Sequence, residues 1–234
     1  IKQVPMEEIL DNIAVEKRYV TRGELFNALK ILDEKCKNID VGHEDVAMDK
    51  LILLLLFEGV RGKGYEDLIN IKLSDIDFEN KRIYLPLSKR YVKIQEEKVW
   101  DLIYQVRNKK NVIYINQDGE NIAKIPAGEP SSFLLIRPVI TGKGFSLDDA
   151  IVKDKIDLIN FTTYSVKIRI KNLVESIDMP YLTGATIYAS GLAERVYKWV
   201  LETEKELNTG AALEYTKTFG EKANINNLTN IVEQ

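Results

Sequence analysis

The sequence has a single histidine, His43, and a single cysteine, Cys36, among its 234 residues. One cysteine excludes an intramolecular disulfide and a structural zinc site built from cysteine pairs. One histidine excludes any catalytic or metal site that requires two imidazoles. Long hydrophobic runs are also lacking, because the longest, residues 51–57, is far shorter than the roughly 20 residues of a membrane span. We therefore expect no membrane partner, and no signal peptide opens the chain.

The net charge of −3 conceals an uneven distribution. Residues 59–110 carry a net charge of +4 and residues 161–200 carry +2, whereas the other three stretches are acidic. If the two basic stretches converge in the fold, they form a patch suited to phosphate groups. The alternative is that these charges are ordinary solvated surface.

Apolar periodicity predicts a mainly α-helical chain with a small antiparallel β-sheet, which is an α+β class. Residues 45–57 are apolar on nearly every side, which predicts a buried central helix. A capping box formed by Thr21 and Glu24 predicts the start of another helix, which precedes the buried one in the sequence. Further helices are expected at residues 6–13, 65–71, 96–106, 161–177, 183–206 and 224–233.

Short strands are expected at residues 83–85, 91–94, 112–115 and 133–136, of which the first two form a β-hairpin. Residues 116–146 contain several Gly and Pro and are expected to be a long irregular insert. The chain therefore divides into a helical part at 1–72, a hairpin and insert at 73–146, and a second helical part at 147–234. It begins with Ile rather than Met, which indicates that an N-terminal part is missing.

One stretch resembles the first conserved box of the tyrosine recombinases, or phage integrases. It runs from Leu53 to Gly59, continues through residues 66–77 with a Ser-Asp-Ile-Asp turn, and ends in a β-strand after Asn80. In that family a buried helix, a second helix, an Asp-Ile-Asp turn and a β-hairpin follow in the same order. The resemblance spans nearly the whole chain, and it implies the family's C-terminal catalytic-domain fold over residues 1–234. The family's DNA-clasping N-terminal core-binding domain is not in this sequence.

Tyrosine recombinases cleave DNA with a tyrosine nucleophile, supported by two Arg, a Lys and one or two His. Carried over to this sequence, the resemblance places Gly64 at the first Arg position, with Arg61 three residues earlier as a substitute. The hairpin lysine corresponds to Lys89 or Lys93. His43 lies before the buried helix and therefore matches neither His position.

The second recombinase box corresponds to the phrase that begins at Leu182. Here Ala185 replaces the first His, Tyr188 replaces the second Arg and Ala189 replaces the second His. Phe219 falls near the nucleophile position, and Tyr215 lies four residues before it. The resemblance therefore implies a recombinase fold without its cleavage apparatus and without catalytic residues, cofactor or metal.

A site that has lost its acid–base groups can still bind double-stranded DNA through backbone phosphates. The two basic stretches and the degenerate site supply the candidate DNA-binding residues. The three on the helix at 161–177 are more typical of a solvated helix face, and Tyr188 could equally fill the core. The candidates are Arg61, Lys63, Lys81, Arg82, Lys89, Arg90, Lys93, Lys167, Arg169, Lys171, Tyr188, Arg195 and Lys198.

The resemblance is closest to the non-cleaving, integrase-fold regulators of temperate phages and prophages. It implies a sequence-specific transcriptional repressor that controls phage lysogeny in the cytoplasm of a bacterial host. Because the C-terminal segment of integrases docks on a partner protomer, it also implies self-association through Ile225, Leu228 and Ile231. Two alternatives stay open. One is an active recombinase with relocated residues such as Arg61 and Tyr215, and the other is a protein-interaction module that no longer binds DNA.

Overall fold

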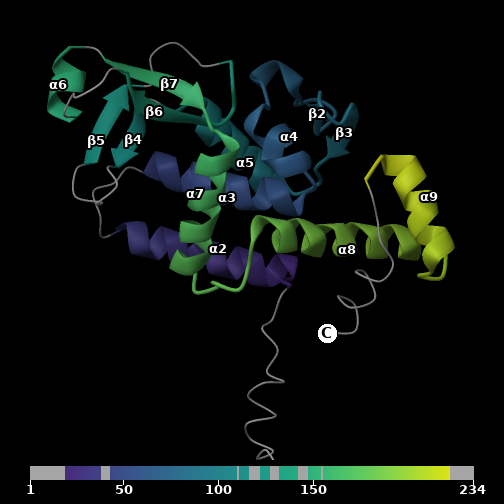
Figure 1. Ribbon diagram of the computed structural model, residues 1–234. Coiled ribbons are helices and arrows are strands. Elements are labelled where there is room, and N and C mark those ends of the chain that lie inside the picture. Colours follow the sequence, from purple (N-terminus) through teal and green to yellow (C-terminus); the bar gives the residue numbers. More distant parts are fainter. Residues whose placement is uncertain are drawn as a thin grey trace, which may run out of the picture.

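Figure 1 shows the computed structural model of the protein, in which most of the elements are helices. It describes residues 19–37, 43–109, 111–115, 122–126, 132–141, 147–153 and 155–221. The α-helices are α2 (Arg22–Lys37), α3 (His43–Phe57), α4 (Glu66–Ile69), α5 (Glu97–Arg107), α6 (Leu147–Val152), α7 (Thr163–Ser176), α8 (Gly184–Glu202) and α9 (Thr209–Phe219). Two short 3-10 helices, Lys63–Tyr65 and Leu73–Asp75, flank α4.

The strands form three small antiparallel sheets. They are β1 (Ile76–Asp77), β2 (Arg82–Leu85), β3 (Arg90–Lys93), β4 (Asn111–Ile115), β5 (Ile122–Pro126), β6 (Ile136–Ile140) and β7 (Ile156–Asn160). The first three strands form one sheet, and the others pair as the hairpins β4–β5 and β6–β7. This arrangement confirms the predicted fold class, a mainly helical chain with small antiparallel sheets.

Helix α3 lies at the centre of the molecule and packs against α2, α5, α7 and α8 (Figure 1). Every side chain from Leu51 to Phe57 is at least 98% buried. This confirms the prediction from the apolar run, since a helix that is apolar all round is stable only when other elements surround it. Each of these side chains contributes about 1.5–3 kcal/mol of burial free energy.

The observed pairing of β2 and β3 confirms the β-hairpin predicted from the sequence. Ile83 pairs with Val92 and both are buried, whereas Tyr84 pairs with Tyr91 on the other face, where the ring centroids lie 5.0 Å apart. Because side chains alternate along a strand, this register separates an apolar inner face from an aromatic and basic outer face. The hairpin is thereby fixed beside the end of α3.

Several predicted elements need correction. The region 116–146 is not wholly irregular, since it contains β5 and β6, and the strand expected at 133–136 lies instead at Ile136–Ile140. The part at 147–234, expected to be helical, contains β7, whose residues alternate between half-buried and exposed in the period of a strand. The predicted helices at 6–13 and 224–233 lie outside the described residues.

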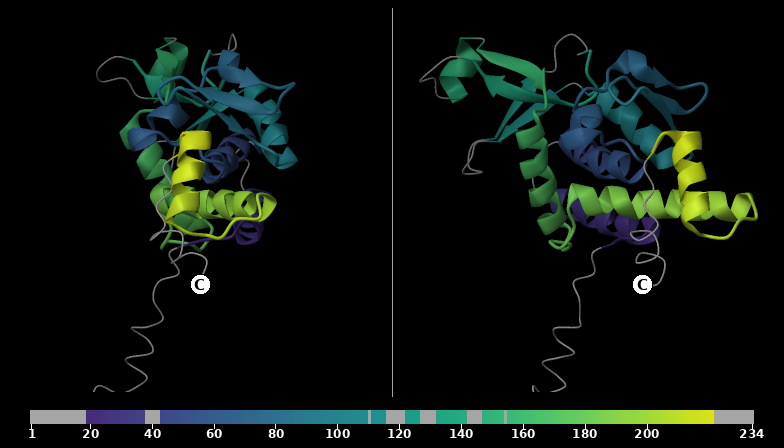
Figure 2. Two further views of the ribbon diagram at one scale, coloured as in Figure 1. Left: turned by 90° about the vertical axis from the view of Figure 1, so that its right-hand side faces the viewer. Right: turned by 45° about the vertical axis from the view of Figure 1, so that its right-hand side comes forward.

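The helix predicted at 183–206 ends at Glu202, and the separate helix α9 follows it. Glu204 has a φ of 52°, a left-handed conformation that no α-helix accommodates. Helix α9 lies across the far end of α8 (Figures 1 and 2). The two helices share a small apolar cluster, separate from the main core, formed by Leu192, Ala193, Val196, Val200, Ala211, Ala212 and Tyr215. Within the described ranges, no helix is long and apolar enough to cross a bilayer.

Candidate functional site

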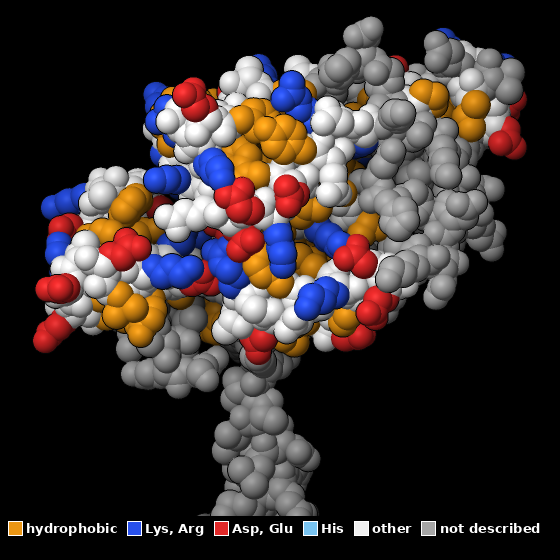
Figure 3. Space-filling model, turned by 180° about the vertical axis from the view of Figure 1, so that it is seen from behind, with side chains coloured by type: hydrophobic (Ala, Val, Ile, Leu, Met, Phe, Trp, Pro, Cys, Tyr) orange, Lys and Arg blue, Asp and Glu red, His pale blue; other side chains and the backbone are white. Residues whose placement is uncertain are grey.

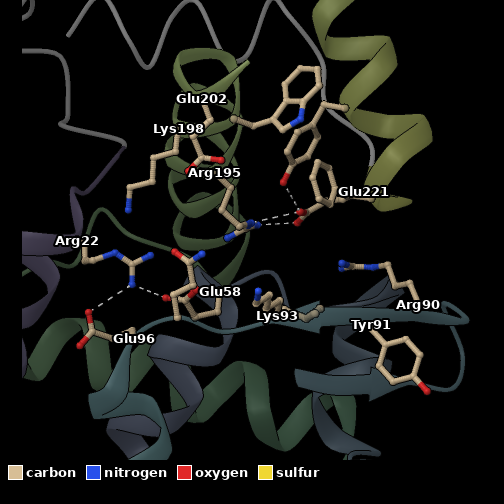
Figure 4. A pocket seen from close by; sticks show the side chains of 15 residues that line it. Arg22, Glu58, Arg90, Tyr91, Lys93, Glu96, Arg195, Lys198, Glu202 and Glu221 are labelled. Atoms are coloured by element: carbon tan, nitrogen blue, oxygen red, sulfur yellow. Dashed lines mark hydrogen bonds and ion pairs between the residues drawn. The ribbon is translucent and has the colours of Figure 1, made fainter. Parts of the chain in front are cut away.

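A pocket of about 410 Å³ lies among β3, α8 and the end of α9 (Figure 4). Four predicted DNA-binding residues line it: two from β3, Arg90 and Lys93, and two from α8, Arg195 and Lys198. The fold therefore brings the two basic stretches of the sequence together. The other lining residues are Arg22, Glu58, Tyr91, Val92, Gln95, Glu96, Trp199, Glu202, Tyr215, Phe219 and Glu221.

Arg195 and Glu221 form the most buried ion pair of this pocket. The Nη2 atom of Arg195 lies 2.6 Å from Oε1 of Glu221, and its Nε atom lies 3.3 Å from Oε2. Glu221 is 3% exposed. Burial lowers the pKa of Arg195, but the Glu221 carboxylate more than compensates, and the pKa is raised overall. Arg195 is therefore held in its charged form away from solvent.

Close backbone contacts make room for the Arg195 guanidinium. Gly191 lies one turn before Arg195 in α8 and passes directly against the carbonyl of Phe57 at the end of α3. The Nη1 atom of Arg195 donates to that same carbonyl oxygen. On the other side, a side chain at Gly59 would lie 2.8 Å from Nη2 of Arg195. The guanidinium thus joins the carboxyl end of α3 to the segment that follows α9.

Two tyrosines turn toward the same carboxylate. Tyr215 donates a hydrogen bond of 3.3 Å to Oε2 of Glu221, and Tyr188 lies close enough for the charge of Glu221 to act on its phenol. Burial, followed by the negative charge of Glu221, raises the pKa of Tyr215 to about 12. The same two causes raise the pKa of Tyr188. Both phenols are therefore held in their neutral form, as hydrogen-bond donors.

Arg90 of the hairpin approaches the same end of α3 as Arg195. Its Nη2 atom donates to the carbonyl oxygen of Gly59 at 2.6 Å. Its positive charge acts on Tyr188 and lowers the pKa of that phenol, against the larger raising effect of burial. Arg90 and Arg195 thus reach the end of α3 from opposite sides, one from a strand and one from a helix.

A second network neutralises other cations at the rim. Arg22 forms an ion pair with the buried carboxylate of Glu58, and its Nε atom lies 2.8 Å from Oε1 of Glu194. Lys198 lies 2.6 Å from the same Glu194 oxygen. Sequence reasoning missed Arg22, Glu58, Glu194 and Glu221. A signal existed for Glu58, because it directly follows the buried run 51–57 and a carboxylate there requires a partner.

The residues at the degenerate recombinase positions differ in their surroundings. Arg61, the predicted substitute for the first Arg, lies between two rings, with its guanidinium carbon 5.5 Å from the centroid of Tyr65 and 5.6 Å from that of Tyr188. Its Nε atom is buried and has no hydrogen-bond partner within the described part of the chain. Gly64 has a φ of 61°, and Ala185 and Ala189 are half-buried in the first turns of α8. Tyr215, rather than Phe219, points its side chain at the Arg195 pair, since Phe219 is 43% exposed and stacks on the Tyr215 ring.

The other predicted DNA-binding residues do not line the pocket. Lys81 pairs with Glu97, and Arg82 lies 2.8 Å from Asp77 and covers the ring of Tyr91. Lys63 and Lys89 are exposed.

On α7, Arg169 turns toward α3 and pairs with Asp49, while Lys167 and Lys171 are exposed. On the face opposite to that of Figure 1, basic and acidic side chains are interspersed (Figure 3). On this face the cationic groups of the described residues therefore do not form a continuous basic surface.

The chain is thus a mostly helical domain in which a β-hairpin and a long helix meet at a pocket. The chain belongs to the family described as "MrpR, C-terminal catalytic domain", whose model matches residues 41–234. The predicted membership of the recombinase-like class is thus confirmed at this level.

Two solved recombinases are similar to the chain. One is the XerH site-specific recombinase bound to palindromic difH substrate in a post-cleavage complex, with 12% identity and a TM-score of 0.49 over 91% of this chain and 48% of XerH. The other is the XerA recombinase, with 14% identity and a TM-score of 0.45 over 92% of this chain and 68% of XerA. The chain therefore spans about half the length of XerH. No curated protein matches it.

Proposed function

We propose that this chain is the DNA-binding domain of a transcriptional repressor that uses a recombinase-like fold without cleaving DNA. The cationic pocket carries the proposal, because it joins Arg90 and Lys93 of β3 to Arg195 and Lys198 of α8 without any histidine. The repressor would be of the kind that maintains lysogeny, as in SPβ-type Bacillus prophages. It would act on double-stranded DNA in the bacterial cytoplasm.

The positions of the cations support DNA as the partner. Lys93 is exposed at the rim, where it can reach phosphate oxygens, Lys198 is exposed beside it but paired with Glu194, and Arg90 and Arg195 lie deeper. Strand β3 and helix α8 each present cations to the pocket. Positive charges spread in this way suit the row of phosphates along a duplex backbone. Phosphate contacts of this kind position a protein on DNA, and base contacts elsewhere would provide the sequence specificity.

The state of the tyrosines supports a domain that does not cleave. A nucleophilic tyrosine needs a pKa below its ordinary value or an adjacent base. The pKa of Tyr215 is instead raised to about 12 by burial and by Glu221, and the Glu221 carboxylate beside it is already bonded to two nitrogens of Arg195. The single histidine, His43, begins α3, about 20 Å along the helix from Phe57 at the pocket. Among the described residues, the lining of the pocket contains no histidine.

An electrophoretic mobility shift over intergenic fragments of the parent genome, at about 150 mM salt, tests the proposal. We expect discrete shifts on a few fragments and no covalent product after denaturation. Lys93→Gln should weaken these shifts, whereas Lys171→Gln on α7, which removes the same charge away from the pocket, should not. Absence of any shift would contradict DNA binding and would favour the protein-interaction module.

An active recombinase is the second candidate. It is favoured by the juxtaposition of Tyr215 and Arg195 in one pocket, a pairing that a transesterification site requires, and by the word "catalytic" in the family description. A nicked duplex that traps covalent intermediates separates the two functions. A DNA–protein adduct that disappears in Tyr215→Phe would establish cleavage and overturn the non-cleaving proposal. Self-association through residues 222–234 stays a prediction, because that segment lies outside the described residues.

A further inference from the structure

The carboxylate of Glu221 is surrounded by hydrogen-bond donors to an unusual degree. Two nitrogens of Arg195 and the hydroxyl of Tyr215 bond to it, and Tyr188 lies close enough for the charge of the carboxylate to act on that phenol. The carboxylate is also nearly inaccessible to solvent, with 3% exposure. A set of charged and neutral donors converging on one buried anion is the coordination that a phosphate group also receives in proteins.

The electrostatics of the pocket depend on this one residue. Its lining has five cationic side chains and four carboxylates, so the presence of Glu221 leaves a net charge of +1 and its departure would leave +2. Glu221 is the only carboxylate of the described pocket lining that forms an ion pair with Arg195, although the charge of Glu58, which pairs with Arg22, also acts on that arginine. Figure 4 shows Glu221 facing Arg195, while Arg22, Glu58 and Glu96 gather at the other end of the pocket.

We infer that Glu221 occupies a phosphate-binding subsite formed by Arg195, Tyr188 and Tyr215, and that a phosphate group binds there when this carboxylate withdraws. The inference rests on the proposed function, because a phosphodiester of DNA is the expected occupant. Glu221 thus acts as an internal competitor that opposes phosphate binding. The ligand class is a phosphate monoanion or dianion, supplied either by a DNA backbone or by a free phosphate.

Glu221 lies just beyond the end of α9, a helix outside the main core. It directly follows Gly220, which ends α9 in the left-handed conformation with a φ of 66°. Helix α9 belongs to the small apolar cluster that it shares with α8, apart from the large core around α3. Rotation at this glycine would move Glu221 while leaving α3 and the hairpin in place.

The test compares the wild-type chain with Glu221→Gln, which keeps the shape of the side chain and removes its charge. Glu214→Gln is the control, since Glu214 lies on the exposed side of α9, pairs with Lys205 and carries the same charge. Thermal unfolding is measured in inorganic phosphate and in chloride at matched ionic strength. We expect phosphate to raise the Tm of Glu221→Gln by about 3 °C or more relative to its effect on the other two proteins.

A duplex-binding experiment then identifies the source of the phosphate. If the occupant is the DNA backbone, Glu221→Gln should bind a duplex about tenfold more tightly, and the slope of log affinity against log salt should steepen by about 0.9. Stabilisation by phosphate with unchanged duplex affinity would support the subsite and assign it to a free phosphate. If the wild-type chain binds no DNA at all but phosphate still stabilises Glu221→Gln, the proposed function fails and the subsite stands.

The inference is overturned if folded Glu221→Gln gains no more from phosphate than wild type and Glu214→Gln. Should Glu221→Gln fail to fold in chloride, recovery of folding in phosphate would support the subsite. If it folds in neither buffer, Glu221→Asp decides, because it retains the charge that compensates Arg195 but withdraws it by one methylene. A gain in Tm for Glu221→Asp above the wild-type gain would then support the subsite, and an equal gain would overturn it.

Discussion

Gly191 of α8 crosses the carboxyl end of α3 so closely that a Cβ atom at this position would lie 1.7 Å from the carbonyl oxygen of Phe57. The contact joins the two helices that carry the core and the pocket. It also brings Arg195, one turn further along α8, within hydrogen-bonding reach of the same carbonyl. The geometry of the pocket therefore depends on the absence of a side chain at residue 191.

Gly191→Ala should destabilise the protein by about 3 kcal/mol, because the clash is with backbone atoms that cannot move independently. Urea unfolding followed by circular dichroism measures the change. Gly23→Ala is the matched control, since a Cβ at Gly23 in α2 meets nothing within 4 Å. The control should be neutral or gain up to about 1 kcal/mol from helix propensity. Equal stabilities of the two variants would show that α8 and α3 can separate at low cost.

Lys93→Gln should lower the affinity for DNA roughly threefold to tenfold. It should also reduce the slope of log affinity against log salt concentration by about 0.9. The physical reason is that the exposed Lys93 at the rim of the pocket neutralises one phosphate. Fluorescence anisotropy with a labelled operator duplex over a salt series provides the measurement. An unchanged slope would remove β3 from the DNA-binding surface.

Arg169→Gln should destabilise the fold by about 2 kcal/mol and leave DNA affinity unchanged. Its partner Asp49 has a side chain that is 18% exposed, and that of Arg169 is 25% exposed, so the pair is only partly screened by solvent. Burial raises the pKa of Asp49 and Arg169 opposes this, so loss of the guanidinium leaves a poorly solvated carboxylate. Denaturant unfolding and anisotropy are measured together, with exposed Lys167→Gln as the control. A loss of DNA affinity in Arg169→Gln at full folding would instead place α7 against DNA.

The turn before the hairpin should make stability depend on pH in acid. Hydrogen bonds from Asn80, first from its backbone N–H and then from its side chain, together with Arg82, lower the pKa of Asp77 from 3.8 to about 2. Because the folded state holds the proton less tightly than the unfolded state, this stabilisation is present above about pH 4 and is lost as the pH falls toward 2.

The stability difference between wild type and Asp77→Asn should therefore shrink over that interval, as measured by urea unfolding at several pH values. Asp101→Asn, on the exposed face of α5, is the control and should show a constant difference. A constant difference for Asp77→Asn as well would mean that the hydrogen bonds of the turn do not favour the charged carboxylate.

The elements that sequence predicted well are those whose pattern is local. Residues 51–57 form an unbroken apolar run, which can be satisfied only by burial on all sides. The hairpin at 82–93 alternates with a period of two around a turn, and both strands were found within one residue of their expected ends. Strand β6 was expected three residues too early and β7 was missed, because both have little apolar contrast and pairing between distant segments, rather than local preference, determines them.

The site illustrates the same limit. The sequence shows two basic stretches but not whether they converge. In the structure they do converge in the pocket, through Arg90, Lys93, Arg195 and Lys198. Glu221 could not be found in advance, because its partner Arg195 lies 26 residues earlier and belongs to another helix. No spacing rule connects two such residues. The same holds for Arg195 and Phe57, which are 138 residues apart.

The sequence by itself determined what chemistry is absent, since a chain with one histidine at residue 43 cannot supply two imidazoles to any single site. It also determined the buried helix and the hairpin, because hydrophobic periodicity acts between near neighbours. The tertiary structure decided which cations meet and which are neutralised. That choice follows from the crossing of α8 over α3 at Gly191 and from the placement of Glu221 against Arg195, contacts that depend on how distant segments pack.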